Sequence, residues 1–214
     1  YTSIQVSPDG TPQVTYFDRD TGSLKFAERN ADGTWAIHVI EQGTGDLGSG
    51  EIGASGALIG MYTSLSVRSD NGFPGVAYLA HVADGAGRRA EVRFATSGAV
   101  HPLSSADWTK FVVDTAALPI EDENSPNIYP LPEGLGLFVD LARMPDSSPA
   151  IVYYDRTAGE LKLSKFAGTA FGTPVVLDGA GDVDAGWSPS VGVDPNGDLW
   201  MTVLESTGQP PRFK

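Results

Sequence analysis

Residues 16–27 read YFDRDTGSLKFA, and residues 153–164 repeat this stretch as YYDRTAGELKLS. A more diverged copy lies between them, with YLAH at residues 78–81 and, after a longer turn, EVRFA at residues 91–95. A repeat of this size is one supersecondary unit, which cannot bury its apolar face alone and must stack on its neighbours. The repeat therefore predicts the architecture of the chain, and it says little about an activity.

Four units are built around this stretch and open in the same way. Each begins with a short strand, at residues 4–6, 65–67, 139–141 and 191–193, followed by a turn rich in Pro, Asp, Asn or Gly. Apolar residues alternate over short runs, which is typical of half-buried strands. Four antiparallel strands per unit, repeated along the chain, indicate an all-β protein with the blades of a β-propeller. A β-sandwich is the main alternative, although sandwiches do not usually repeat a motif so literally.

The spacing predicts three complete blades and a partial one. We expect the complete blades at about residues 1–42, 62–115 and 137–178, and two strands of a fourth blade at about residues 188–214. About three and a half blades cannot close a ring, because propellers use ~4–8 blades. The open ends would leave bare strand edges. We therefore expect the remaining blades in another chain or in a further segment of the polypeptide.

Composition narrows the classes of partner and compartment. The 214 residues carry a net charge of −13, which makes binding to nucleic acid or to an anionic membrane surface improbable. No apolar stretch approaches the ~18 residues that a membrane helix needs, so no membrane insertion is expected. The absence of cysteine excludes disulfides and thiolate catalysis. Scarce lysine with abundant Thr, Ser, Gly and Asp suggests an exported bacterial protein.

Several short motifs carry a family resemblance. They are GDL at residues 45–47, YTSL at residues 62–65, Pro74, Tyr78, GDV at residues 181–183 and WS at residues 187–188. Together with the repeated Tyr-Tyr-Asp…Gly-x-Leu-Lys-x-Ala pattern, they resemble the repeats of bacterial extracellular β-propeller proteins. The resemblance covers nearly the whole chain. It implies a secreted or cell-surface protein that acts as a scaffold or binding module more often than as a catalyst.

Three side chains at the ends of repeated strands are candidate ligand contacts. Asp18 and Asp155 occupy equivalent places, each followed by an arginine, and His81 stands where the other copies have Arg19 and Arg156. The carboxylates could serve as acids, bases or ligand contacts. Their repetition favours a structural role, in which each carboxylate accepts turn N–H groups and pairs with the arginine. His81 departs from the repeat, most simply through drift.

Two aromatic residues and three aspartates complete the candidate sites. Tyr62 and Trp187 precede a first strand in two blades and are candidates for ligand contact or for packing between blades. Asp46 and Asp182 lie in matching loops between blades, with Asp184 two residues further on. Several carboxylates in a flexible loop could hold calcium, although the motif is incomplete. The alternative is a solvated turn in which the aspartates cap backbone amides.

Two function classes follow from these residues. The first is a non-catalytic binding or structural propeller module of a secreted or cell-surface bacterial protein, with a protein or glycan ligand. The second is a carbohydrate-active propeller, which could be a lectin, a glycoside hydrolase or a lyase. A hydrolase would need two carboxylates facing each other across a pocket, ~5–10 Å apart. Where Asp18 and Asp155 point therefore discriminates between the two.

Overall fold

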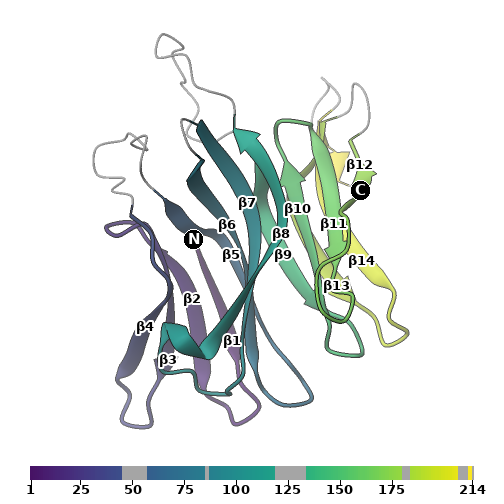
Figure 1. Ribbon diagram of the computed structural model, residues 1–214. Coiled ribbons are helices and arrows are strands. Elements are labelled where there is room, and N and C mark those ends of the chain that lie inside the picture. The colour runs from purple at the N-terminus through teal and green to yellow at the C-terminus, as the bar shows by residue number, and fades with distance from the viewer. Residues whose placement is uncertain (45–56, 85–86, 119–133, 180–183, 207–211, 214) are drawn as a thin grey trace.

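The computed structural model describes residues 1–44, 57–84, 87–118, 134–179, 184–206 and 212–213. In these residues the chain forms four antiparallel sheets in sequence order, which are the blades of a β-propeller (Figure 1). Blade 1 contains β1 (Thr2–Val6), β2 (Pro12–Asp18), β3 (Ser23–Arg29) and β4 (Trp35–Glu41). Blade 2 contains β5 (Leu58–Val67), β6 (Pro74–Asp84), β7 (Gly87–Ser97) and β8 (Trp108–Leu118). A single turn of 3-10 helix, Ser105–Asp107, precedes β8.

Blade 3 contains β9 (Leu135–Arg143), β10 (Pro149–Asp155), β11 (Glu160–Lys165) and β12 (Val175–Asp178). Blade 4 contains β13 (Asp184–Val193), β14 (Leu199–Ser206) and β15 (Arg212–Phe213). The fourth sheet thus has three strands, one more than the sequence predicted, because β15 adds a short pairing to β14. The first strands of the later blades also begin before the predicted residues, since each continues through a bulge that interrupts the alternation of apolar residues.

The first strands of the four blades lie next to one another, on the inner side of the sheets. β1 contacts β5, β5 contacts β9, and β9 contacts β13, while each sheet extends outward from its first strand. Side chains from facing sheets fill the space between blades. Leu24, Phe26, Leu65 and Tyr78 are buried between blades 1 and 2, and the largest cluster lies mainly between blades 2 and 3.

Hydrogen bonds from equivalent tyrosines also join the blades. Tyr78 on β6 donates its hydroxyl hydrogen to Glu41 of blade 1, and Tyr153 on β10 donates to Asp114 of blade 2, with 2.7 Å between Oη and Oδ2. Each bond joins the second strand of one blade to the last strand of the blade before it. The repeated tyrosine of the sequence is therefore a connection between blades.

Candidate functional site: the groove along the first strands

A bulge with left-handed backbone recurs in the first strand of three blades. Tyr62, Phe138 and Ser188 have φ angles of 52°, 52° and 48°, and each lies two residues after a glycine that also has a positive φ. Such angles are uncommon for residues other than glycine. At Gly60 and Gly186 a Cβ atom would meet Leu24 and Leu161 of the preceding blade at 2.7 Å and 3.0 Å. Close packing of neighbouring blades therefore requires these glycines.

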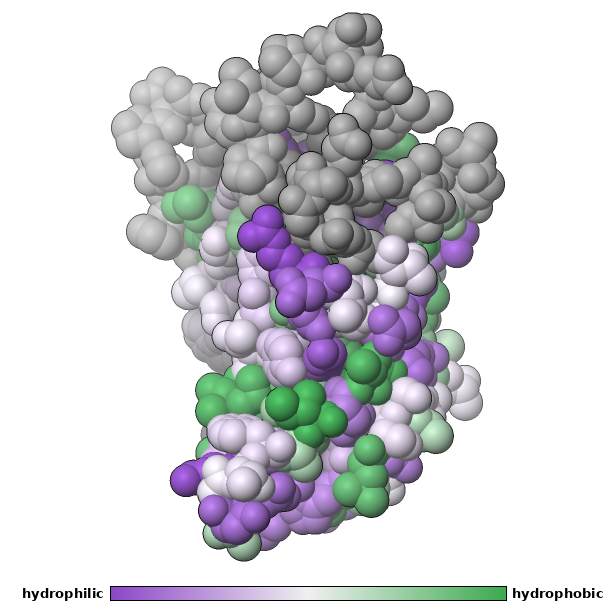
Figure 2. Space-filling view, turned by 90° about the vertical axis from the view of Figure 1, so that its left-hand side faces the viewer, coloured by the Kyte–Doolittle hydropathy of each residue, from purple (hydrophilic) through white to green (hydrophobic). Residues whose placement is uncertain are grey.

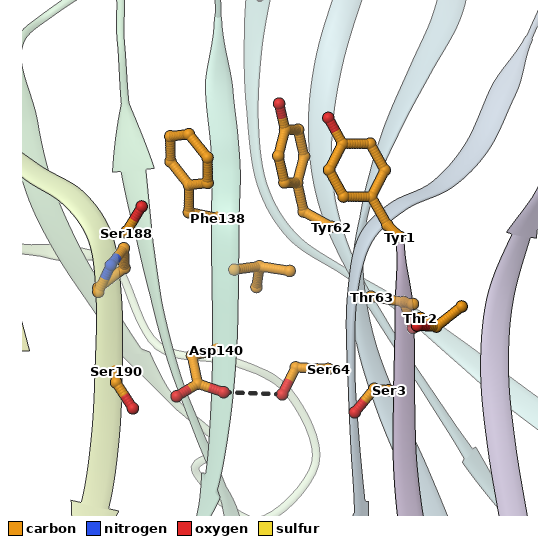
Figure 3. A pocket seen from close by; sticks show the side chains of 12 residues that line it. Tyr1, Thr2, Ser3, Tyr62, Thr63, Ser64, Phe138, Asp140, Ser188 and Ser190 are labelled. Carbon is orange, nitrogen blue, oxygen red and sulfur yellow. Dashed lines mark hydrogen bonds between the residues drawn. The ribbon is translucent and has the colours of Figure 1, made fainter.

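The bulges place a row of aromatic rings along the first strands (Figure 3). The ring centroids of Tyr1 and Tyr62 are 4.1 Å apart, and those of Tyr62 and Phe138 are 4.9 Å apart in an edge-to-face arrangement. Trp187 continues the row at 6.0 Å from Phe138 and contacts Tyr154 at 5.2 Å. The two aromatic residues nominated from the sequence, Tyr62 and Trp187, thus belong to one row and are joined through Phe138.

The hydroxyl group of Tyr62 is an unsatisfied polar group. Its Oη atom is buried and has no hydrogen-bond partner among the described residues. Burial, with the Tyr1 hydroxyl as a smaller contribution, raises the pKa of Tyr62 well above its ordinary value, so this hydroxyl stays protonated. Buried polar atoms usually have a partner, and an exception calls for an explanation such as a ligand or an ordered water.

A second row, of hydroxyl and carboxylate groups, runs beside the rings and connects successive blades. Ser3 Oγ accepts a hydrogen bond from the Leu65 amide at 3.0 Å, and Ser64 Oγ accepts one from the Leu141 amide at 3.2 Å. Asp140 Oδ2 accepts one from the Val191 amide at 2.8 Å. Asp140 Oδ1 also accepts from Ser64 Oγ at 2.8 Å and from the Leu141 amide at 3.0 Å. We call those of these bonds that join two different blades the inter-blade ladder.

The aromatic row and the inter-blade ladder line one open groove of about 440 Å³. Its twelve lining residues come from the four first strands and the residue before β1: Tyr1, Thr2, Ser3, Tyr62, Thr63, Ser64, Phe138, Val139, Asp140, Ser188, Pro189 and Ser190. Asp140 is the only carboxylate among them. Its two oxygens are already engaged by blades 2, 3 and 4, so it fixes the geometry of the groove.

Asp18 and Asp155 do not reach this groove. Asp18 lies at the β2–β3 turn, where it accepts from the Asp20 amide at 3.1 Å and forms an ion pair with Lys25 at 2.5 Å. Asp155 accepts from the Ala158 amide at 3.2 Å and pairs with Lys162 at 2.6 Å. The hydrogen bond from Lys25 holds the pKa of Asp18 below its ordinary value. The structural role expected from repetition thus fits both residues, with a lysine of the next strand as a cationic partner.

His81 is enclosed within blade 2, away from the residues that line the groove. It is 1% exposed, and neither ring nitrogen has a hydrogen-bond partner among the described residues. Burial, with the charge of Arg88 as a smaller cause, lowers the pKa of His81 to about 4. The side chain is therefore neutral at pH 7, and its two polar atoms destabilise the folded state.

The aspartates proposed for calcium are only partly within the described residues. Asp46 and Asp182 lie outside them. Asp184 accepts hydrogen bonds from Tyr154 Oη at 2.6 Å and from Trp187 Nε1 at 3.1 Å, so it orients the end of the aromatic row. Within the described residues, no group of three or more His, Asp or Glu side chains could hold a metal ion. The calcium site stays a prediction.

Other aromatic residues of the repeat have separate roles. Trp108 is buried between blades 1 and 2 and donates its indole N–H to His38 Nε2 at 3.0 Å. Trp35 holds the equivalent place in blade 1 and is 43% exposed. Sequence reasoning nominated Tyr62 and Trp187 but missed Phe138, Asp140 and Ser190. The sequence signal that could have found them is a glycine that recurs at the same place in three blades, at Gly60, Gly136 and Gly186. The groove residues follow two and four positions after each glycine.

Comparison with known proteins identifies neighbours by structure alone. No family model matches the sequence, and no curated protein matches it. The described fold is similar to the crystal structure of alpha-L-arabinofuranosidase from Lactobacillus brevis, with a TM-score of 0.54 and 14% identity over 96% of this chain and 62% of that one. It is also similar to polysaccharide lyase Uly1, with a TM-score of 0.50 and 12% identity over 97% of this chain and 49% of that one.

This chain therefore spans less than two thirds of the length of either neighbour. At such low identity the likeness concerns the fold and leaves the site residues unmatched. No helix within the described residues is long and apolar enough to cross a membrane. The chain is accordingly an all-β protein of β-propeller architecture, with its blades joined at the centre by the inter-blade ladder.

Proposed function

We propose that the chain is a non-catalytic, glycan-binding β-propeller module of a secreted or cell-surface bacterial protein. The observation that carries this proposal is the groove along the first strands, where a row of aromatic rings lies beside a row of hydroxyl groups. Small-molecule sites are typically concave and largely apolar, with a few convergent polar groups. A sugar ring offers apolar C–H faces to aromatic rings and hydroxyl groups to polar side chains, and the groove supplies both.

Tyr62 strengthens this proposal because its buried hydroxyl group lacks a hydrogen-bond partner among the described residues. A sugar hydroxyl or ring oxygen could supply that hydrogen bond, and its formation would recover part of the cost of burying Oη. Tyr1 lies beside Tyr62, and both hydroxyl groups point toward the same end of the groove in Figure 3. We therefore place the ligand along Tyr1, Tyr62 and Phe138.

The distribution of carboxylates argues for binding without hydrolysis. A glycoside hydrolase with two catalytic carboxylates needs them ~5–10 Å apart across the substrate. Among the residues that line the groove, Asp140 stands alone, and its oxygens accept hydrogen bonds from two backbone amides and Ser64. Asp18 and Asp155 pair with lysines at the strand turns. The two fold neighbours are named as an arabinofuranosidase and a polysaccharide lyase, which supports a carbohydrate as the ligand. The proposal that this chain binds without catalysis rests on its own residues.

The test is isothermal titration calorimetry with neutral arabino- and galacto-oligosaccharides and with one acidic oligosaccharide series. We expect binding by at least one series. Tyr62→Ala and Phe138→Ala should each weaken that binding at least about fivefold, because each removes a ring worth ~1 kcal/mol or more of contact. Trp35→Ala is the matched control, since Trp35 is an exposed aromatic residue on β4, outside the groove.

Tyr62→Phe sharpens the test because it keeps the ring and removes only the hydroxyl group. A loss of affinity with an unchanged melting temperature would assign Oη to the ligand. Absence of binding in every series would overturn the glycan proposal and leave the scaffold function. Repeating the titration and the melting curve with added calcium tests the proposed ligands Asp46, Asp182 and Asp184, since a true site should raise the melting temperature.

A further inference from the structure

The chain carries one apolar sheet face on blade 1 that its other blades do not cover. Ile4 of β1 is 62% exposed, whereas Leu65 and Leu141, which have the same place in blades 2 and 3, are 2% and 7% exposed. The pairing register establishes the equivalence, because Ile4 faces Val14 just as Leu65 faces Val76. Val6 on the same face is 59% exposed. Figure 2, which views the left-hand side of Figure 1, shows several hydrophobic side chains among hydrophilic ones on the surface.

Blade 4 carries the complementary open face. Trp200 of β14 is 68% exposed, whereas Gln13 and Ala150 at the same place in blades 1 and 3 are fully buried by the blade that follows. Here too the register fixes the equivalence, since Trp200 pairs with Gly192 as Gln13 pairs with Gln5. The chain therefore presents both halves of the contact that it repeats internally three times.

The inter-blade ladder indicates how these halves would join. Ser3, Ser64 and Asp140 each accept a hydrogen bond from a backbone amide in the first strand of the following blade. Ser190 is the equivalent residue of blade 4, and it is exposed. The Ile4 amide has the place of the Leu65 donor by register.

We propose that a second copy of this chain packs its blade 4 against blade 1, with Ser190 Oγ accepting a hydrogen bond from the Ile4 amide. The same contact repeated by a two-fold axis would cover both open faces of both copies. Four sheets from each of two copies make eight, which lies within the ~4–8 blades of closed propellers. Exposed apolar patches of this kind mark protein interaction sites.

Charge gives this association a distinctive salt dependence. Each copy carries a net charge of −13, so two copies repel each other at long range while Ile4, Val6 and Trp200 are buried at the contact. Added salt screens the repulsion over a Debye length of ~10 Å at 0.1 M. The fraction of dimer should therefore rise with salt, whereas a contact made by opposite charges would weaken.

Light scattering coupled to size-exclusion chromatography tests the proposal on the 214-residue chain. We expect a mass twice the 22.5 kDa of one copy. Ile4→Asp and Trp200→Asp should each shift the mass to the monomer, because each places a charge in the contact. Leu103→Asp is the matched control, since Leu103 is 80% exposed and precedes β8, outside both faces. Val6→Asp is a second variant of the blade 1 face.

Mixing the two single variants discriminates between geometries. A copy with Ile4→Asp keeps an intact blade 4, and a copy with Trp200→Asp keeps an intact blade 1, so the mixture should recover a dimer through one remaining contact. A dimer made by blade 1 against blade 1 would persist in Trp200→Asp alone. A monomeric parent chain at every concentration and salt, or a dimer that survives Ile4→Asp and Val6→Asp, would overturn the proposal.

Discussion

Leu65 and Ile4 hold the same place in the repeat, yet one lies between two blades and the other faces solvent. Leu65 is 2% exposed against blade 1, and Ile4 is 62% exposed. Tyr78 and Tyr16 differ in a related way: Tyr78 is fully buried and bonded to Glu41 of the preceding blade, and Tyr16 is half-buried on the open side. The repeat defines the type of contact, and the neighbouring blade determines how much that contact stabilises the fold.

The largest difference should appear when this position is truncated in both blades. Leu65→Ala removes a buried side chain between packed sheets and should lower the free energy of unfolding by about 3 to 4 kcal/mol. Ile4→Ala, at concentrations where the chain is monomeric, should change it by about 0.5 kcal/mol or less. Urea denaturation measures both. Equal losses at the two positions would contradict the comparison, because they would mean that a further element already covers blade 1.

A second contrast separates His81 from its counterparts Arg19 and Arg156. The pKa of His81 is about 4 in the folded protein, against an ordinary value of 6.5, so the unfolded chain binds the proton more tightly. The free energy of unfolding should therefore fall as the pH is lowered from about 6.5 to about 4. Its loss should approach about 3 kcal/mol, at 1.36 kcal/mol for each pKa unit.

The variant His81→Leu isolates this contribution from those of His38 and His101, whose pKa values shift in opposite directions. Leucine needs no hydrogen bonds in the apolar surroundings of β6, so the variant should be more stable than the parent protein at pH 7. Its advantage should grow below pH 6. Parallel stability curves for the two proteins between pH 7 and pH 4 would show that His81 finds a partner in the folded chain.

The smallest of these effects concerns the inter-blade ladder. Asp140→Ala leaves the Val191 amide without its acceptor and removes the bond from Ser64, so it should cost about 2 kcal/mol. Ser190→Ala changes the equivalent residue of blade 4 and should cost less than about 0.5 kcal/mol in the monomer. Thermal unfolding of both variants provides the measurement. A large loss from Ser190→Ala in the monomer would show that the ladder already continues beyond blade 4.

Much of the fold was predictable because the repeat preserves both the strand order and the turn residues. In β2 the burial alternates because one face is covered, but the covered residues are the polar Gln13 and Thr15 while the apolar Val14 is half-buried, which is the reverse of what hydrophobic alternation predicts. In β10 all seven residues are buried, because sheets cover both of its faces. The apolar run of β10 is consistent with a strand covered on both faces, but periodicity alone does not distinguish such a strand from other buried segments.

The groove was less predictable, since it depends on backbone angles that alternation does not reveal. Tyr62 and Trp187 were nominated from their matching places, but the left-handed conformation that brings Phe138 into the same row follows only from the structure. The lysine partners of Asp18 and Asp155 were not foreseen. Lys25 and Lys162 lie opposite Tyr16 and Tyr153 across the hairpins, on the same face as the aspartates, and this diagonal placement brings them within reach of Asp18 and Asp155.

The recurring bulge has a practical consequence for protein engineering. Because Tyr62, Phe138 and Ser188 already adopt the left-handed backbone, the strands keep their register while side chains as different as tyrosine, phenylalanine and serine occupy this place. Blades 2, 3 and 4 thus each offer one variable position toward the groove, held by a glycine two residues earlier. A combinatorial library at these three codons would diversify the groove while keeping the strand register, with the smallest change in packing at the exposed Ser188.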